Sequence, residues 1–448
     1  MLYHIVTFGC QMNLSDGERT KKVIEAMGYQ WTDNEEEAQL LGILACSVRQ
    51  KAIDRVYARI SRWNKWKNKR NLLTFVSGCL LESDRGKFLK LFDLVFPTEE
   101  MPGLPDMISR YGVVTPLSKM NLEDATGIYQ FWKIDPSYKS NFEAFVPIQN
   151  GCDKFCAFCA VPYTRGREVS RPSDEILEEV YRLVNDGYKS ITLLGQNVNS
   201  YGLDKKGVEI SFPQLLEKIG KFGDQSQKQF WVYFTSPHPR DMTEDVLDVI
   251  SQYSCLANWI HLPLQSGDDH VLIKMNRKHN TEKYLRIVDA VRQKLPTATL
   301  FTDIIVGFPG ETEEQMENTR KIFRMVGFNM AYIATYSSRP GATSSRWEDD
   351  IPLSVKKDRL HILTEDMKDY TRVYNNQYIG KNLEVLVYGP DKKAGYLSGY
   401  TEGKIGVRFQ SDDESLIGNI VTLTINQATP FALDGELVPV HSTTLSLS

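Results

Sequence analysis

The chain has 448 residues, of which 42% are hydrophobic and 25% charged, and its formal net charge is −4. This length exceeds one ordinary domain, and the composition is typical of globular domains rather than of disordered or fibrous chains. No apolar run approaches the roughly eighteen residues that span a bilayer, so we expect a cytoplasmic protein with no membrane association. The slightly acidic balance excludes a generally basic nucleic-acid binder but leaves room for local basic patches.

The first hundred residues contain short apolar runs, and three of these runs end in a cysteine. The four runs are Ile5–Cys10, Leu40–Cys46, Leu72–Cys79 and Asp93–Pro97. A helix with a capping box formed by Ser15 and Glu18 is expected between the first two runs. Alternating strands and helices predict a parallel sheet, and such sheets gather their ligands at the carboxyl ends of the strands. We therefore expect Cys10, Cys46 and Cys79 to converge at one edge of the sheet.

A strongly basic stretch follows the second run. Between Arg49 and Arg70 there are nine Lys or Arg residues against one acidic residue, Asp54, with Trp63 and Trp66 interleaved. Taken alone, the pattern favours a solvated helix face whose tryptophans anchor the core. The alternative is a helix that binds phosphates.

The next feature is a Cys-x3-Cys-x2-Cys run formed by Cys152, Cys156 and Cys159, with no fourth cysteine nearby. Three thiolates can hold three irons of a cubane cluster and leave the fourth iron open to a ligand from outside the protein. Zinc is the alternative because thiolates also suit that metal, but no fourth ligand follows at the spacing of a zinc finger. With seven cysteines, an odd number, and no export signal, metal or redox roles are favoured over disulfides.

From residue 144 onward, strands and helices alternate about six times, which predicts a partial (β/α)6 barrel. The expected strands are Phe145–Asn150, Ser190–Asn197, Trp231–Thr235, Trp259–Leu264, Thr299–Val306 and Ala331–Tyr336. Thr312 and Gln315 form a capping box for the helix after the fifth strand, which we expect to end near Gly327. In such barrels, functional residues follow the carboxyl ends of the strands.

After a polar helix from Ser354 to Tyr378, the pattern changes to short β-branched runs separated by Gly and Asp. These runs begin at Leu383, Lys404 and Ile420, and they predict a small antiparallel β-barrel. The expected fold class is therefore α/β with an additional small barrel. The expected domains are a parallel-sheet α/β domain in residues 1–125, a partial (β/α)6 barrel in residues 138–370 and the antiparallel barrel in residues 376–440.

Six short motifs are spread over nearly the whole chain. They are Gly9-Cys-Gln-Met-Asn13, Cys46-Ser-Val-Arg49, Gly78-Cys79, His261-Leu-Pro-Leu-Gln-Ser-Gly267, Asp303-Ile-Ile-Val-Gly-Phe-Pro-Gly-Glu-Thr312 and Tyr336-Ser-Ser-Arg-Pro-Gly341. Together they resemble the radical S-adenosylmethionine methylthiotransferase family, which has the same domain order and ends in a TRAM domain. The first two motifs are most similar to the MiaB branch, which acts on isopentenyl-type adenosine next to the tRNA anticodon. The chain departs from the family at Leu44-Ala45 and at Gly17, and neither departure removes a cysteine.

The resemblance implies two [4Fe-4S] clusters and S-adenosylmethionine as cofactors. Cys152, Cys156 and Cys159 (the radical triplet) would be the catalytic set, whose open iron binds S-adenosylmethionine. Cys10, Cys46 and Cys79 (the auxiliary triplet) would bind a second cluster that carries sulfur, with buried structural thiols as the alternative. The other residues implied in cofactor binding are Phe158, Gln196, Asn197, Ser236, Gln265, Arg277 and Asp303.

The activity implied is conversion of N6-isopentenyladenosine in tRNA to its 2-methylthio derivative by radical C–H sulfur insertion and methylation. One S-adenosylmethionine would methylate a sulfur on the auxiliary cluster. A second would be cleaved reductively to a 5′-deoxyadenosyl radical that abstracts hydrogen from C2 of adenine. The implied partners are the tRNA anticodon stem-loop and a low-potential electron donor such as flavodoxin or ferredoxin, and the sequence does not identify the sulfur donor.

With tRNA as the substrate, phosphate contact becomes the favoured role of the basic stretch. The residues expected to make this contact are Arg49, Arg62, Lys65, Lys67 and Lys69. Two other functions remain open: a methylthiotransferase that acts on threonylcarbamoyladenosine in tRNA, and a non-catalytic iron-sulfur protein that binds RNA or transfers electrons.

Overall fold

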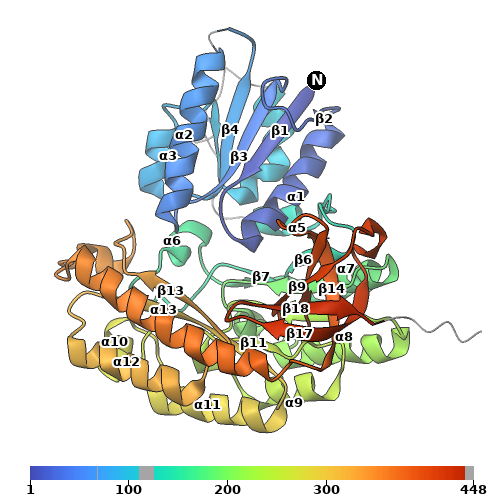
Figure 1. Ribbon diagram of the computed structural model, residues 1–448. Coiled ribbons are helices and arrows are strands. Elements are labelled where there is room, and N and C mark those ends of the chain that lie inside the picture. Colours follow the sequence, from blue (N-terminus) through green and yellow to red (C-terminus); the bar gives the residue numbers. More distant parts are fainter. Residues whose placement is uncertain (68, 110–125, 439–448) are drawn as a thin grey trace, which may run out of the picture.

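The computed structural model describes residues 1–67, 69–109 and 126–438, and it divides into three parts (Figure 1). An N-terminal α/β domain lies above a central barrel of strands and helices, and a small C-terminal barrel lies beside the central one. The expected end points of the first and third domains, residues 125 and 440, lie outside the described residues. None of the helices within the described ranges combines the length and the apolar character that crossing a bilayer requires.

The N-terminal domain contains the predicted parallel sheet, in the order β2-β1-β3-β4-β5. The strands are β1 (Leu2–Thr7), β2 (Gln30–Trp31), β3 (Leu40–Cys46), β4 (Leu73–Cys79) and β5 (Leu94–Val95). The helices are α1 (Gln11–Ala26), α2 (Gln50–Lys67), α3 (Glu82–Phe88), α4 (Leu104–Ser109) and α5 (Thr126–Trp132), with a 3-10 turn at Thr98–Gly103. Sequence analysis missed β2, because two residues show no alternation.

The capping box expected at Ser15 and Glu18 is wrong. Helix α1 begins earlier, at Gln11, with Cys10 rather than Ser15 in the N-cap position. Ser15 instead donates to the carbonyl oxygen of Phe145, and Glu18 accepts from the backbone N–H of Lys139. Both side chains serve the contact between the first two domains, which a local pattern does not reveal.

The central barrel is built from six strands in two parallel three-stranded sheets, β10-β9-β6 and β11-β12-β13. The strands are β6 (Glu143–Pro147), β9 (Ser190–Leu194), β10 (Trp231–Phe234), β11 (Trp259–His261), β12 (Thr299–Val306) and β13 (Met330–Thr335), and a short antiparallel pair is formed by β7 (Gln149–Asn150) and β8 (Val169–Ser170). The helices are α6 (Val161–Arg165), α7 (Ser173–Asn185), α8 (Phe212–Ser226), α9 (Glu244–Gln252), α10 (Asp269–Lys274), α11 (Thr281–Lys294) and α12 (Glu313–Val326). The capping box of Thr312 and Gln315 and the end of its helix at Gly327 are confirmed.

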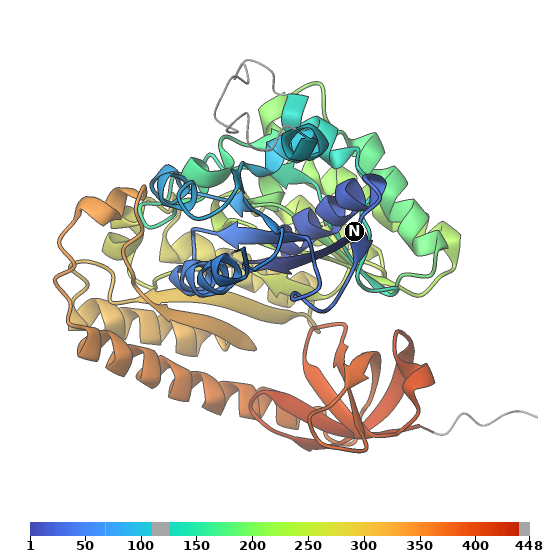
Figure 2. The same cartoon turned by 90° about the horizontal axis from the view of Figure 1, so that it is seen from above.

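Helix α13 (Leu353–Asn376) runs along the barrel and leads into the C-terminal barrel, as Figure 2 shows. That barrel is closed, in the order β14-β15-β16-β18-β17. Its strands are β14 (Asn382–Pro390), β15 (Tyr396–Thr401), β16 (Gly406–Gln410), β17 (Ile420–Ala428) and β18 (Ala432–Leu437). The predicted small barrel is confirmed, but it is not wholly antiparallel, because β16 and β18 pair in parallel.

The C-terminal barrel packs against the inner strands of the central barrel. Leu386 of β14 is fully buried among Trp231, Tyr233 and Trp259, and Tyr400 of β15 packs at the edge of the same cluster. The hydroxyl of Tyr400 also donates to Glu143 of β6. The C-terminal barrel thereby covers aromatic side chains that would otherwise meet solvent.

Candidate active site

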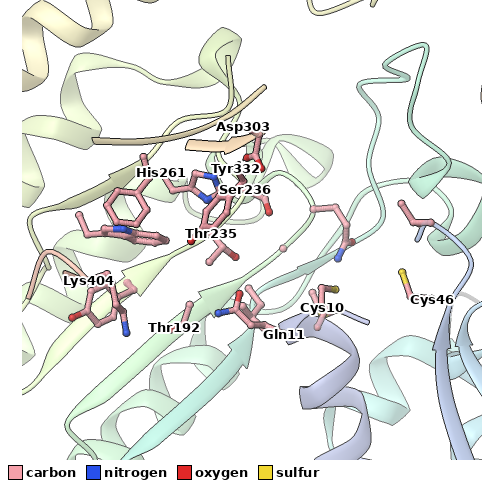
Figure 3. Close-up of a pocket in the computed structure, with 18 of the residues that line it drawn as sticks. Cys10, Gln11, Cys46, Thr192, Thr235, Ser236, His261, Asp303, Tyr332 and Lys404 are labelled. Atoms are coloured by element: carbon pink, nitrogen blue, oxygen red, sulfur yellow. Dashed lines mark hydrogen bonds and ion pairs between the residues drawn. The ribbon is translucent and has the colours of Figure 1, made fainter. Parts of the chain in front are cut away.

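One cavity of about 900 Å³ lies where the three parts of the molecule meet (Figure 3). Cys10, Gln11 and Cys46 of the N-terminal domain form one side of it, and Lys404 of the C-terminal barrel lies on the opposite side. Between them lie residues from the strands of the central barrel, including Ser236 and Asp303. The cavity therefore depends on all three parts for its walls.

The structure brings the auxiliary triplet together as the sheet topology predicts. Cys46 and Cys79 end neighbouring parallel strands and are paired in register, while Cys10 precedes α1. The Oδ1 atom of Asn13 lies 3.6 Å from Cys10 Sγ and 3.7 Å from Cys79 Sγ. A hydrogen bond from Cys79 lowers the pKa of Cys46 to about 6 against the effect of burial, and raises the pKa of Cys79 well above its usual value.

Arg165 links this triplet to the central barrel. Its Nε donates to Cys79 Sγ at 2.7 Å, its Nη2 to Asp16 Oδ2 at 2.6 Å and its Nη1 to Asn150 Oδ1 at 3.0 Å. Arg165 is 8% exposed, so these three bonds satisfy a buried cation from both domains. The guanidinium of Arg165 is therefore already paired with a carboxylate of this chain, that of Asp16.

The radical triplet lies on the loop after β7. Cys152 and Cys156 are buried and Cys159 is partly buried, and burial, reinforced by neighbouring thiols, raises the pKa of both Cys152 and Cys159 to about 12. The Nη1 of Arg277 lies 3.6 Å from Cys156 Sγ. The triplet and Phe158 do not belong to the residues that line the cavity, although Val161 at the end of this loop does.

Three residues expected to bind S-adenosylmethionine carry buried polar atoms that lack a partner within the described residues. These atoms are Gln196 Oε1, Asn197 Oδ1 and Arg277 Nε. A buried polar group without a hydrogen bond is costly, so these atoms indicate a ligand that the protein itself does not supply. Gln196 lines the cavity, whereas Asn197 and Arg277 lie outside its lining.

Ser236 and Gln265 follow barrel strands and have positive φ angles, of 61° and 75°. Non-glycine residues in this region are strained and cluster at functional sites. The backbone of Gln265 is fixed by bonds to both Asp303 and Ile305. Asp303 Oδ2 in turn accepts from His261 Nε2 at 2.7 Å, and both side chains line the cavity.

Sequence reasoning missed the part of the cavity next to the C-terminal barrel. Its walls are largely aromatic. The residues are Tyr233, Trp259, His261, Phe301, Tyr332, Tyr388, Tyr400 and Lys404. His261 lies within a motif already singled out. The other side chains lie on strands of the two barrels or, for Lys404, in a turn, and none of them belongs to a motif.

The five basic residues expected to contact tRNA differ in their position and in their ion pairs. Arg49 is exposed and lines the cavity. Lys65 and Lys69 are exposed near the other end of α2, about 24 Å or more along the helix axis from Arg49. Arg62 and Lys67 pair with Glu35 at 2.7 Å and with Asp93 at 2.6 Å, so their charges are partly neutralised.

Three family models match this chain, and together they cover all three parts. The Radical SAM superfamily matches residues 146–323, the uncharacterized protein family UPF0004 matches residues 2–96, and the TRAM domain matches residues 376–438. The fold and the cavity thus belong to a radical S-adenosylmethionine enzyme with an added N-terminal domain and a TRAM barrel. The TRAM barrel is the C-terminal barrel described above.

Comparison with whole proteins defines the family further. The chain is 39% identical over 98% of its length to a tRNA-2-methylthio-N(6)-dimethylallyladenosine synthase of Clostridium perfringens, covering 98% of that protein. It is 38% identical over 97% of its length to a synthase of the same name from Staphylococcus aureus, covering 84% of it. The chain therefore belongs to the tRNA-2-methylthio-N(6)-dimethylallyladenosine synthase family. This result confirms the resemblance to radical methylthiotransferases.

A solved structure supports the fold. The radical S-adenosylmethionine methyltransferase TsrM from Kitasatospora setae superposes with a TM-score of 0.56 at 13% identity. The superposition covers 87% of this chain and 79% of that one. At this identity the likeness concerns the fold alone.

The residues present fit the cofactors of this family, two [4Fe-4S] clusters and S-adenosylmethionine. Within the described ranges, no three His, Cys, Asp or Glu side chains approach one another as the ligands of a single metal ion do. The fit rests instead on two sets of three thiols, which are suitable iron ligands. It also rests on the unpartnered atoms of Gln196, Asn197 and Arg277, which suit the amino and carboxylate groups of a methionine.

Proposed function

We propose that this protein converts N6-isopentenyladenosine in tRNA to its 2-methylthio derivative. The observation that carries the proposal is the shared cavity, which has the auxiliary triplet on one side and the strand ends of a radical S-adenosylmethionine barrel beside it. Membership of the synthase family supports the same reaction. A cavity shared by the auxiliary triplet and the barrel strand ends would let one bound base face both sets of residues.

We assign the residues to two tasks. The radical triplet would hold a cluster that, with S-adenosylmethionine, supplies radical chemistry, and the auxiliary triplet would hold the cluster that supplies sulfur. Gln196 and Asn197 would accept hydrogen bonds from the amino group of S-adenosylmethionine, and Arg277 would pair with its carboxylate. Ser236, Gln265 and Asp303 would position its sugar or the substrate base.

The substrate base must leave its stack to reach this cavity. An unpaired base of an anticodon loop can be extruded at lower cost than a base in a duplex. A base bound between the barrel strands, α1 and the C-terminal barrel would displace water from the cavity. This exclusion protects a reactive centre from side reactions.

A low-potential donor such as flavodoxin or ferredoxin is the proposed source of electrons. Phe155 belongs to the loop of the radical triplet and is 36% exposed, and the nearby Tyr163 is 49% exposed. Arg167 lies over the Phe155 ring. These exposed rings neighbour the radical triplet in the sequence, and a donor docked on them would lie beside that loop.

The decisive experiment is anaerobic reconstitution with iron, sulfide, S-adenosylmethionine and a reductant, followed by mass spectrometry of an anticodon stem-loop RNA. We expect 5′-deoxyadenosine and a methylthio group on RNA that contains N6-isopentenyladenosine. Methylthiolation of threonylcarbamoyladenosine instead would favour the alternative substrate. Absence of 5′-deoxyadenosine would favour a non-catalytic iron-sulfur protein. Mass spectrometry of tRNA nucleosides from a strain that lacks this protein would show which methylthioadenosine is lost in the cell.

A further inference from the structure

Lys404 occupies the side of the cavity opposite the auxiliary triplet, and the sequence gives it no role (Figure 3). It lies in the tight turn between β15 and β16 with φ of 57°, where its N–H donates to the carbonyl oxygen of Thr401. The turn is fixed to the central barrel. Thr299 donates to the carbonyl oxygen of Gly403 at 2.7 Å, and Glu402 accepts from the N–H of Asn258 at 2.8 Å.

The ammonium group of Lys404 lies between two aromatic rings. Its Nζ is 3.5 Å from the ring centre of Tyr400 and 4.0 Å from that of Tyr233. Glu143 Oε1 lies 3.8 Å away, beyond hydrogen-bond distance, and already accepts from the Tyr400 hydroxyl at 3.1 Å. Burial lowers the pKa of Lys404 to about 7 despite Glu143, and a nearby anion would favour its charged form.

Two neighbouring side chains that line the same part of the cavity carry buried polar atoms. The Tyr233 hydroxyl and the Trp259 indole N–H are buried and lack partners within the described residues. The indole can only donate, the ammonium can only donate, and the hydroxyl can do so as well. An acceptor-rich group with negative charge therefore fits this position. In an RNA substrate, that group is the sugar-phosphate backbone.

We propose that Lys404, with Tyr233 and Trp259, binds the sugar-phosphate backbone of the target nucleotide while its base lies in the cavity. This inference rests on the proposed function, because it takes tRNA as the substrate. Tyr388, which is 49% exposed and stacked on Tyr400, leaves a face for an adjoining base. The TRAM barrel would then act as a wall of the reaction chamber.

The first test measures binding of an anticodon stem-loop RNA with N6-isopentenyladenosine to the cluster-loaded protein by fluorescence anisotropy. In Lys404→Met we expect about tenfold weaker binding, the order of one charged hydrogen bond. The slope of log K against log salt should fall by about 0.7 to 0.9, the value for one phosphate contact. Lys404→Arg should restore most of the slope.

Lys393→Met is the matched control. Lys393 belongs to the same barrel and lies 3.7 Å from the ring centre of Tyr396, but it is exposed and does not line the cavity. We expect its affinity and salt slope to match the wild type. An equal loss in both variants would overturn the proposal, because the effect would then be that of general TRAM charge. Wild-type behaviour of Lys404→Met would overturn it too.

The second test alters the RNA and does not depend on the folding of a variant. A neutral methylphosphonate beside the target nucleotide should weaken wild-type binding about tenfold, and the same change at a distant stem phosphate should not. In Lys404→Met the first change should have no further effect, as expected for two partners of one contact. Independent, additive losses would overturn the contact. If the wild type binds no isopentenylated RNA at all, the proposed function fails together with this inference.

Discussion

Arg165 is the residue through which two domains share one charge network. Its guanidinium contacts the auxiliary Cys79, the carboxylate of Asp16 on α1 and Asn150 at the start of the radical loop. A buried cation with three partners is stable only while all of them remain. The N-terminal sheet edge and the radical loop are therefore held in one relative position.

We expect Arg165→Gln to impair loading of the auxiliary cluster, because Cys79 loses its donor and Asp16 becomes an unpaired buried charge. The iron content of the reconstituted protein should fall from about eight to about four atoms per chain, as two cubane clusters become one. Iron and sulfide analysis measures this change.

Arg167→Gln is the control for that variant. Arg167 lies two residues further along, pairs with Asp153 at 2.8 Å and has a side chain that is 74% exposed. It should retain the full iron content. Full iron content in both variants would show that Arg165 is not needed to position the auxiliary site.

At the scale of elements, helices α1 and α7 join the N-terminal domain to the barrel. Arg19 of α1 and Arg171 both pair with Glu179 of α7, which also accepts from the Tyr138 hydroxyl at 2.6 Å. Burial raises the pKa of Glu179, but the two arginines and this hydrogen bond outweigh it and lower the pKa to about 2. The carboxylate of Glu179 is therefore ionised at neutral pH, and it forms ion pairs with Arg19 of the N-terminal domain and with Arg171 of the central barrel.

Glu179→Gln should lower the free energy of unfolding by about 3 kcal/mol at neutral pH, since it breaks a buried charge network. Because the folded pKa lies below the usual 4.5, this stabilisation is present above about pH 4.5 and is lost as pH falls toward 2. Urea unfolding at several pH values measures the difference from wild type.

Glu175→Gln provides the comparison on the same helix. Glu175 also pairs with Arg171, at 3.4 Å, but its side chain is 32% exposed. Its substitution should change the free energy of unfolding by no more than about 1 kcal/mol. A similar cost for the two variants would contradict a special role of Glu179.

The basic helix α2 is a second element with a testable role. Its far end presents Lys65 and Lys69, whereas reversing Lys67 would also break the pair with Asp93. The double variant Lys65→Glu, Lys69→Glu should weaken tRNA binding and reduce the salt slope by about 1.5, the value for two phosphate contacts. Lys357→Glu is the control, because Lys357 is an exposed residue of α13, and it should leave tRNA binding unchanged. Unchanged binding in the double variant would remove this end of α2 from the interface.

At the scale of the whole molecule, the C-terminal barrel and the central barrel share a hydrophobic cluster. Leu386 and Val387 are consecutive on β14 and both fully buried, but Leu386 packs on the central barrel and Val387 inside the C-terminal one. Substituting Leu386 therefore probes the contact between the two barrels, whereas substituting Val387 probes the core of the C-terminal barrel.

Leu386→Ala should cost about 3 kcal/mol through the cavity that it leaves. It should also increase quenching of tryptophan fluorescence by acrylamide, because Trp231 and Trp259 lose their cover. Val387→Ala should lower stability without increased quenching. Equal quenching in both variants would mean that the junction does not depend on Leu386.

The sequence alone was sufficient for the fold class and the family, and it predicted that Cys10, Cys46 and Cys79 meet at one edge of a sheet. Parallel strands end at one edge of a sheet, so cysteines at strand ends must converge, and motif spacing is a local property. The choice of Arg165, Glu179 and Lys404 as joining residues was decided only by tertiary structure. Each of them has at least one partner more than one hundred residues away in another domain, at a separation that no local pattern encodes. The cavity likewise exists only where three separately recognisable parts are packed together.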